Sequence, residues 1–315
     1  MIRAFAAATF DGTTVVHDPA VGTNHLPPRP ITAGCLGLDD HEVAAWPLAD
    51  PAALALDYPL SMCWSPIVRC NLACPHCLDD KHVRESTAAE RSAAAGHIAA
   101  SGVLGVDISG GEPLLLRDLP DLALAIRRQG TTVVSCTTNA WHLARRAPEL
   151  AGTLDAIRVS LDGATAATHD TWRGQDSHRH AVAGIRAAVA EGLFVQLQMV
   201  LMHANKHEAQ QLLELATHLG AGGVTFLQML PIGEGEALAA EQMLTDEQAR
   251  EVVDRLTVPD GVRVRLRTRT SAGGFTVLRA DGFAWRNTRD ATDISVFIPV
   301  TGPGDLRLPI PGSAS

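Results

Sequence analysis

The stretch LSMCWSPIVRCNLACPHC, residues 60–77, places three closely spaced cysteines directly after a short apolar run. Residues 60–64 have the length and composition of a buried strand. The cysteines then follow with the spacing C-x3-C-x2-C. Because soft thiolate ligands suit iron–sulfur clusters or zinc, the stretch predicts a strand that leads into a metal-binding loop, with Cys70, Cys74 and Cys77 as the ligands.

Downstream of this loop, short apolar runs alternate with amphipathic stretches, which predicts βα units around a parallel sheet. Thr87 and Glu90 form a capping-box pattern that begins one helix, and Thr245 and Gln248 begin the last one. The expected strands are residues 60–64, 103–108, 132–136, 156–161, 194–199 and 223–227.

The segments on either side of this region have a different character. Residues 1–56 are interrupted by Pro and Gly and contain two expected short strands, residues 13–17 and a stretch near Ile31. We expect them to form an N-terminal extension packed on a main domain of residues 57–258. Residues 259–315 are expected to form a small β-rich C-terminal cap, with a turn at 273–274 and a frayed tail from residue 309.

Composition limits the classes of partner. The chain has 315 residues, 46% of them hydrophobic, and a net charge of −9, which argues against general binding to nucleic acid or to an anionic membrane. No apolar run approaches the roughly 18 residues of a membrane span, and residues 4–10 end at Asp11 without a cleavage-like site. We therefore expect a cytoplasmic protein, and the preference for Arg over Lys indicates a bacterial source.

A second motif, Ser109-Gly110-Gly111-Glu112-Pro113, ends the second strand, where ligands bind in parallel α/β sheets. The glycines allow a ligand to approach the backbone, Glu112 offers a carboxylate to an ammonium group, and Pro113 fixes the turn. Together with the cysteine loop, this motif resembles the radical S-adenosylmethionine (SAM) superfamily. The likeness covers residues 58–235 and is nearest to the branch of molybdenum-cofactor-synthesis enzymes and peptide maturases.

The resemblance implies a partial (β/α)6 TIM-like barrel in which the three cysteines hold a [4Fe–4S] cluster. SAM would chelate the fourth iron, with its amino group at Gly110, Gly111 and Glu112 and its carboxylate or ribose near Ser160. The N- and C-terminal segments are expected to act as lids. An electron donor such as flavodoxin or ferredoxin is the implied protein partner.

Three other positions match the superfamily, and a fourth, His76, departs from its pattern. His76 takes the place of a residue that is usually aromatic and lies by the adenine. Asp162 is expected to bond either to ribose or to its own turn backbone, and Arg173 either pairs with a carboxylate or lies in solvent. Asn139, after the third strand, is similarly open.

The remaining cysteines and arginines narrow the chemistry. No cysteine follows Cys136, so the C-terminal part of this sequence has no ligands for a cysteine-bound auxiliary cluster. Cys63 and Cys136 are either small core residues or thiols that return a hydrogen atom to the substrate. Arg265, Arg267 and Arg269 either contact substrate or cover solvated strand faces, and residues 275–283 are expected to form a hairpin that caps the barrel mouth.

The resemblance thus implies reductive cleavage of SAM to a 5′-deoxyadenosyl radical that abstracts a hydrogen atom from the substrate. The missing auxiliary cysteines favour a small polar metabolite, of sugar or nucleoside type, tailored in natural-product biosynthesis by epimerisation, decarboxylation, dehydration or C–C bond formation. The alternative is a ribosomal-peptide maturase. A third hypothesis is a zinc-stabilised binding protein in which His76 or His82 completes the cysteine site.

Overall fold

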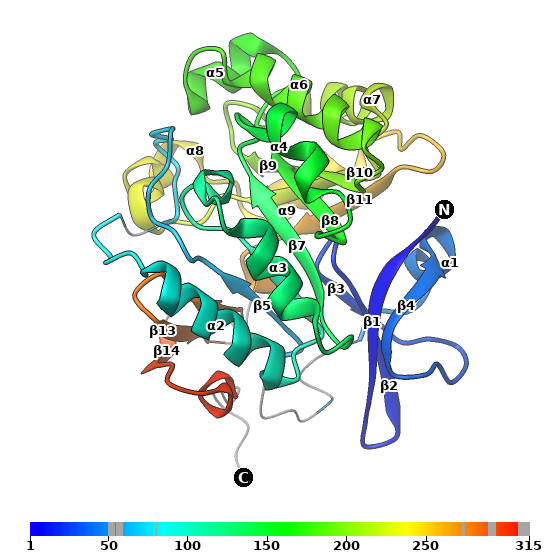
Figure 1. The fold of residues 1–315 in the computed structure, drawn as a ribbon. Coiled ribbons are helices and arrows are strands. Elements are labelled where there is room, and N and C mark those ends of the chain that lie inside the picture. The colour runs from blue at the N-terminus through cyan, green and yellow to red at the C-terminus, as the bar shows by residue number, and fades with distance from the viewer. Residues whose placement is uncertain (50–53, 55–58, 80, 273–274, 289–293, 308–315) are drawn as a thin grey trace.

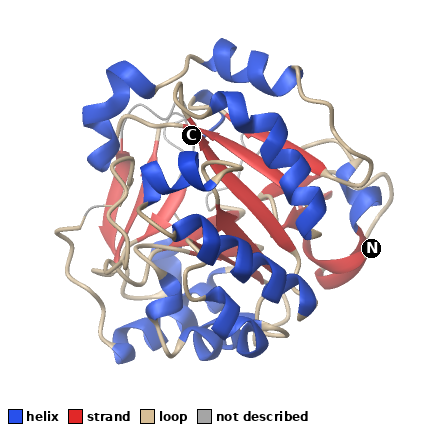
Figure 2. Ribbon diagram, turned by 90° about the horizontal axis from the view of Figure 1, so that it is seen from above, coloured by secondary structure: helices blue, strands red, loops and turns tan. Residues whose placement is uncertain are grey.

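A computed structural model describes residues 1–49, 54, 59–79, 81–272, 275–288 and 294–307. The fold is α/β and is built on a ten-stranded sheet in the order β11-β10-β9-β8-β7-β6-β5-β12-β13-β14, with helices around its outer face (Figures 1 and 2). Seven of its strands are parallel neighbours: β5 (Ser61–Trp64), β6 (Gly105–Ile108), β7 (Val133–Thr138), β8 (Ala156–Ser160), β9 (Val195–Leu201), β10 (Gly223–Gln228) and β11 (Arg263–Arg267). The six expected strands are therefore confirmed, in the partial-barrel order that the resemblance implies.

The helices follow the strands as the βα pattern predicts. Both capping boxes are present, with Thr87 beginning α2 and Thr245 beginning α9. The helices are α1 (Asp40–Ala44), α2 (Ala88–Ser101), α3 (Leu119–Arg127), α4 (Leu143–Leu150), α5 (Ala166–Arg173), α6 (Ser177–Ala190), α7 (Ala209–Leu219), α8 (Ala239–Gln242) and α9 (Asp246–Asp254). Short 3-10 helices occur at η1 (Pro113–Leu115), η2 (Lys206–Glu208), η3 (Gly233–Leu238), η4 (Thr270–Ala272) and η5 (Pro303–Leu306). None of the helices in these ranges has the length and hydropathy to cross a membrane.

The C-terminal residues join the barrel sheet at both of its edges. Strand β11 pairs in parallel with β10, which makes it a seventh barrel strand. At the other edge, β12 (Thr276–Leu278) pairs in parallel with β5, and β13 (Phe283–Asn287) and β14 (Ile294–Pro299) continue antiparallel. The expected hairpin over residues 275–283 is present and extends the sheet. The expected turn at 273–274, the boundary at 56 and the tail from 309 lie outside the described residues.

The N-terminal residues form an antiparallel sheet in the order β3-β2-β1-β4. Its strands are β1 (Ile2–Phe10), β2 (Thr13–Asp18), β3 (Thr23–His25) and β4 (Gly34–Asp39), so β2 is confirmed and the strand expected near Ile31 begins later. Figure 1 shows this sheet on the side of the barrel away from the loop that joins β5 to α2. The expectation that the N-terminal segment is a lid over the radical site is therefore wrong, because it packs at the opposite end of the strands.

Two contacts fix the N-terminal sheet to the beginning of the barrel strands. The His17 imidazole lies so close over Gly105, the first residue of β6, that a Cβ there would stand 2.0 Å from Nε2. A buried group of two carboxylates and two guanidinium groups joins the sheet to β11, with Asp18 Oδ2 2.6 Å from both Arg3 and Arg263. Residues 17–22 thus form the floor of the barrel.

Candidate active site

The three cysteines lie on the loop between β5 and α2. Cys70 is exposed and Cys74 and Cys77 are half-buried. Burial raises the pKa of each thiol, that of Cys74 to about 11, and the cysteines act on one another electrostatically. The Glu85 carboxylate fixes the start of the loop by accepting the backbone N–H groups of Val68 and Arg69 at 3.1 and 2.6 Å. The loop thus gathers three thiols that depend on bound metal to ionise near neutral pH.

The glycines of the second motif serve the packing of this same loop. A Cβ on Gly110 would stand 2.3 Å from the Ile67 carbonyl oxygen, and one on Gly111 would stand 2.2 Å from that of Arg69. The backbone N–H of Gly111 donates to the Ile67 carbonyl at 2.9 Å. Since only glycine leaves room for this approach, the motif positions the segment directly before Cys70, a role that the sequence expectation of a close ligand did not include.

Glu112 is an internal anchor of the site. Its fully buried carboxylate accepts hydrogen bonds from the backbone N–H groups of Leu114 and Asn139 and from the Thr138 hydroxyl, at 2.6–2.9 Å. Burial raises the pKa of Glu112, and these donors oppose the rise. Pro113 begins η1 directly after it and is buried. The carboxylate is therefore committed to the protein, as are the backbone N–H groups of Gly111 and Glu112, which donate to the Ile67 and Arg69 carbonyls.

Asn139 connects the end of β7 to the cysteine loop. Its Nδ2 donates to Asn71 Oδ1 at 3.0 Å and lies 3.7 Å from the Cys70 Sγ, while its Oδ1 accepts the Trp141 N–H. Asn139 thus contacts the segment of the first cysteine from the end of β7, two strands away from β5 in the sheet.

Asp162 is the centre of a buried polar link. Its Oδ2 accepts from Arg173 Nε at 2.5 Å and from His76 Nε2 at 3.0 Å, and its Oδ1 accepts the Val200 N–H at 2.9 Å. Burial opposes ionisation, but Arg173 and His76 outweigh it and hold the pKa of Asp162 well below its usual range. Its backbone N–H donates to His169 Nδ1. Of the two expectations for Arg173, pairing with a carboxylate is the one observed.

His76 is therefore positioned by a carboxylate. The ring lies edge-on to Trp172, with centroids 6.1 Å apart, and is buried. The Asp162 carboxylate thus holds the imidazole through its Nε2 atom. Among the described residues, the buried Nδ1 atom of this ring has no hydrogen-bond partner. A buried polar atom without a partner, on the residue directly before Cys77, fits a site that a ligand completes.

The strand residues divide cleanly between two faces. Val106 and Ile108 of β6 and Ile157 and Val159 of β8 are buried in the core beneath the helices. The alternate residues face the inside of the barrel, where Cys63, Ser135 and Gln196 are buried. Others keep partial exposure although they lie mid-sheet: Asp107, Ser109, Thr137, Arg158, Ser160, Gln198 and Arg267. We call this inner face the lumen, and most of its side chains are polar.

This division separates the two candidate hydrogen donors. Cys136 is fully buried in the core between the sheet and its helices, so it cannot reach a substrate in the lumen, and its proposed role is wrong. Cys63 faces the lumen, with its Sγ 2.9 Å from the Ser109 hydroxyl. Burial raises the pKa of the Cys63 thiol to about 12, so its hydrogen is retained at neutral pH.

Two lumen residues were missed by the sequence analysis. Asp107 and Arg158 each stand alone as a charge within an otherwise apolar strand, in the runs GVDI and AIRVS. That pattern is the signal that would have found them, because a charge inside a buried strand is stable only with a partner or a solvated face. Their guanidinium and carboxylate lie 3.5 Å apart.

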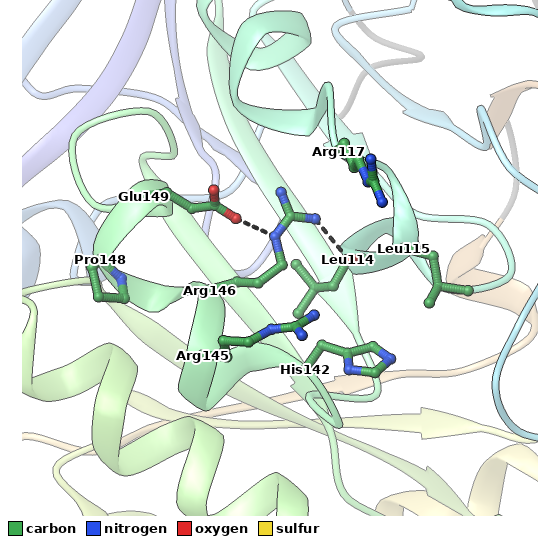
Figure 3. A pocket seen from close by; sticks show the side chains of 8 residues that line it. All are labelled: Leu114, Leu115, Arg117, His142, Arg145, Arg146, Pro148 and Glu149. Atoms are coloured by element: carbon green, nitrogen blue, oxygen red, sulfur yellow. Dashed lines mark hydrogen bonds and ion pairs between the residues drawn. The ribbon is translucent and has the colours of Figure 1, made fainter.

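A separate pocket of about 510 Å³ opens on the outer surface between η1 and α4 (Figure 3). Arg146 lies along its wall, where it donates to the Leu114 carbonyl and pairs with Glu149. Arg117, Arg145 and His142 also line it. Its position outside the sheet separates it from the lumen.

The residues present fit a [4Fe–4S] cluster. Within the described ranges, no three His, Cys, Asp or Glu side chains converge so as to hold a metal ion. A cubane places different requirements on its ligands, since each cysteine binds a different iron and the thiols need only surround a common space. Three thiols on one anchored loop, with the Arg173 guanidinium acting on Cys74 and Cys77, meet that requirement.

Comparison with known proteins agrees with this geometry. The sequence pattern of the Radical SAM superfamily matches residues 64–216. A probable GTP 3′,8-cyclase of Metallosphaera sedula is 33% identical over 165 residues, which is 51% of this chain and 51% of that protein. A GTP 3′,8-cyclase of Erythrobacter litoralis is 31% identical over 203 residues, 61% of each chain. The chain thus spans half to three-fifths of these relatives.

Solved structures share the fold at low identity. SuiB of Streptococcus suis bound to its precursor peptide SuiA aligns with a TM-score of 0.61 and 14% identity, over 73% of this chain and 60% of SuiB. The enzyme anSMEcpe with bound AdoMet aligns with a TM-score of 0.54 and 15% identity, over 72% of this chain and 74% of that one. Residues 64–216 therefore match a radical SAM domain, and the cofactors of that domain's family are a [4Fe–4S] cluster and SAM.

Proposed function

We propose that the chain is a radical SAM enzyme that cleaves SAM at one cluster and abstracts a hydrogen atom from a small polar metabolite of sugar or nucleoside type. The observation that supports a polar substrate is the lining of the lumen. It includes partly exposed polar side chains and is floored by residues 17–22. On the same inner face, the Arg267 guanidinium carbon lies 4.5 Å from the centroid of the Phe275 ring.

Each part of the site has a role in this proposal. Cys70, Cys74 and Cys77 hold the cluster, and the backbone of Gly110–Glu112 with the Ser160 hydroxyl holds SAM. When bound, the cofactors supply one-electron cleavage of the sulfonium and hydrogen-atom abstraction from carbon. The chain orients SAM and presents the protonated Cys63 thiol to the lumen.

A peptide maturase is the second candidate, because the fold is shared with SuiB, which was solved with its precursor peptide. A peptide needs access to the lumen from outside along an extended path, whereas a small metabolite needs only the space within it. The two are separated by measuring which addition accelerates SAM cleavage: GTP and nucleotide sugars, or synthetic peptides.

The radical SAM assignment itself has a direct test. The purified chain, reconstituted anaerobically, is expected to bind about 4 Fe and to release 5′-deoxyadenosine from SAM under dithionite. Cys74→Ala is expected to abolish that product. Cys35→Ala is the matched control, because this exposed cysteine lies on β4 of the N-terminal sheet. Stoichiometric zinc in a colourless protein, or unchanged turnover by Cys74→Ala, would refute the proposal.

A further inference from the structure

The lower part of the lumen carries more positive than negative charge. Three guanidinium groups face it, from Arg158 on β8 and from Arg265 and Arg267 on β11, and the carboxylate among them is that of Asp107. The chain as a whole carries a net charge of −9. A local excess of cations inside an acidic protein attracts small anions to this one place.

Most of these groups are satisfied by the protein. Asp107 accepts hydrogen bonds from the Ser135 and Thr137 hydroxyls, both at 2.7 Å. Arg158 Nε donates to the Ala20 carbonyl of the floor at 3.0 Å, and Arg265 donates to the Val21 carbonyl. These contacts build the base of the lumen and hold both side chains in place.

Arg267 differs from its neighbours. No carboxylate of the described residues lies within ion-pairing distance of Arg267. Its guanidinium group stacks over the Phe275 ring, with the guanidinium carbon 4.5 Å from the ring centroid. Burial and the Arg158 charge lower the pKa of Arg267 to about 10, so it is still protonated at neutral pH. Cys63 and Asp107 also act on it electrostatically.

We propose that Arg267 binds an anionic group of the substrate, a phosphate or a carboxylate, within the lumen. This inference rests on the proposed function, since it names the substrate class of the same site. The planar guanidinium presents paired N–H donors that match either anion, and stacking on Phe275 fixes its plane in advance. Arg267 is thus a specificity residue that selects an anionic metabolite and sets its orientation within the lumen.

The test measures anion binding by calorimetry on the reconstituted full chain at low ionic strength. Inorganic pyrophosphate is the phosphate probe and malonate is the carboxylate probe, so the lower dissociation constant identifies the preferred anion. The wild-type chain is expected to bind one of them at a single site, and Arg267→Gln to weaken it by about ten-fold or more, as removal of a charged hydrogen-bond partner does. Arg128→Gln, which removes an exposed guanidinium at the end of α3, is the matched control.

Arg267→Lys keeps the charge and removes the paired donors, and it decides the question if Arg267→Gln fails to fold or to bind iron. It is expected to weaken binding by a smaller factor than Arg267→Gln. Wild-type chain that binds neither probe, or affinity unchanged in Arg267→Gln or in Arg267→Lys, overturns the inference. A wild-type chain that binds an anion through Arg267 but forms no 5′-deoxyadenosine leaves the anion site standing and refutes the proposed function instead.

Discussion

Replacing Asp162 by Asn is expected to destabilise the folded chain by about 3 kcal/mol. The substitution leaves an acceptor for the Val200 N–H but removes the charge that pairs with Arg173, whose side chain is only 11% exposed. Breaking a buried ion pair by removing one partner costs about 3–5 kcal/mol, and the retained hydrogen bond places this case at the lower end. The melting temperature is expected to fall by roughly 6 °C.

The assay is urea unfolding followed by circular dichroism, with the midpoint and slope compared between variants. Asp176→Asn is the matched control, because its 3.5 Å pair with Arg179 is exposed and is expected to contribute less than about 1 kcal/mol. A free energy of unfolding for Asp162→Asn within about 0.5 kcal/mol of wild type, or an equal loss in Asp176→Asn, would refute the reasoning.

The pH dependence gives an independent check on the same pair. The folded-state pKa of Asp162 is held well below its usual range, so its contribution is fully present above the unfolded pKa of about 3.9 and is lost as the pH falls toward the folded value. The stability difference between wild type and Asp162→Asn is therefore expected to stay constant from pH 8 to about 5 and to shrink below about pH 4. A difference that already shrinks between pH 8 and 6 points to another group.

Two further substitutions test other parts of the fold. Gly111→Ala places a Cβ 2.2 Å from the Arg69 carbonyl oxygen, so it is expected to lower the free energy of unfolding by about 1–3 kcal/mol and to lower the iron content. Gly96→Ala has open space around it in α2 and is expected to raise the free energy of unfolding by about 0.5–1 kcal/mol. Equal iron content in the two variants would contradict the packing argument. Asp18→Asn leaves Arg3 and Arg263 sharing one buried carboxylate, so the free energy of unfolding is expected to fall by about 3–5 kcal/mol. Proteolysis of the N-terminal sheet is expected to become faster. An unchanged rate of proteolysis would show that this ion-pair group does not fix the floor.

The barrel strands were predictable because each is a short, strongly apolar run that ends at a polar signal. Their helices carry local caps, such as Thr87 with Glu90, which act within one turn and so can be read from sequence alone. The strand β1 was missed because its residues are mainly small alanines with weak alternation, and its pairing depends on β2 and β4. Whether residues 1–49 lie above or below the barrel is set by non-local contacts such as Asp18 with Arg263.

In the candidate site, too, the positions of some residues could be predicted from the sequence, whereas their interaction partners could not. Strand ends in a parallel sheet are known from the order of elements, which is why Glu112, Asn139, Ser160 and Asp162 could be selected as neighbours. Their partners could not, because a carboxylate at a strand end is equally able to meet a ligand, an arginine or backbone N–H groups. The carboxylates of Glu112 and Asp162 both accept hydrogen bonds from other groups of the protein, and only the folded structure shows which donors reach them.

The departure of His76 from an aromatic residue becomes intelligible once its partner is known. An aromatic ring at this position needs only apolar contact, whereas a buried imidazole needs a group for each ring nitrogen. Asp162 supplies one, and it stays ionised because Arg173 pairs with it. Histidine, aspartate and arginine therefore function as one unit: without Arg173 the carboxylate loses its charge partner, and without Asp162 the imidazole loses the group that holds its Nε2 atom. The Nδ1 atom of the same ring has no partner among the described residues, so it is the part of this unit that a ligand would complete.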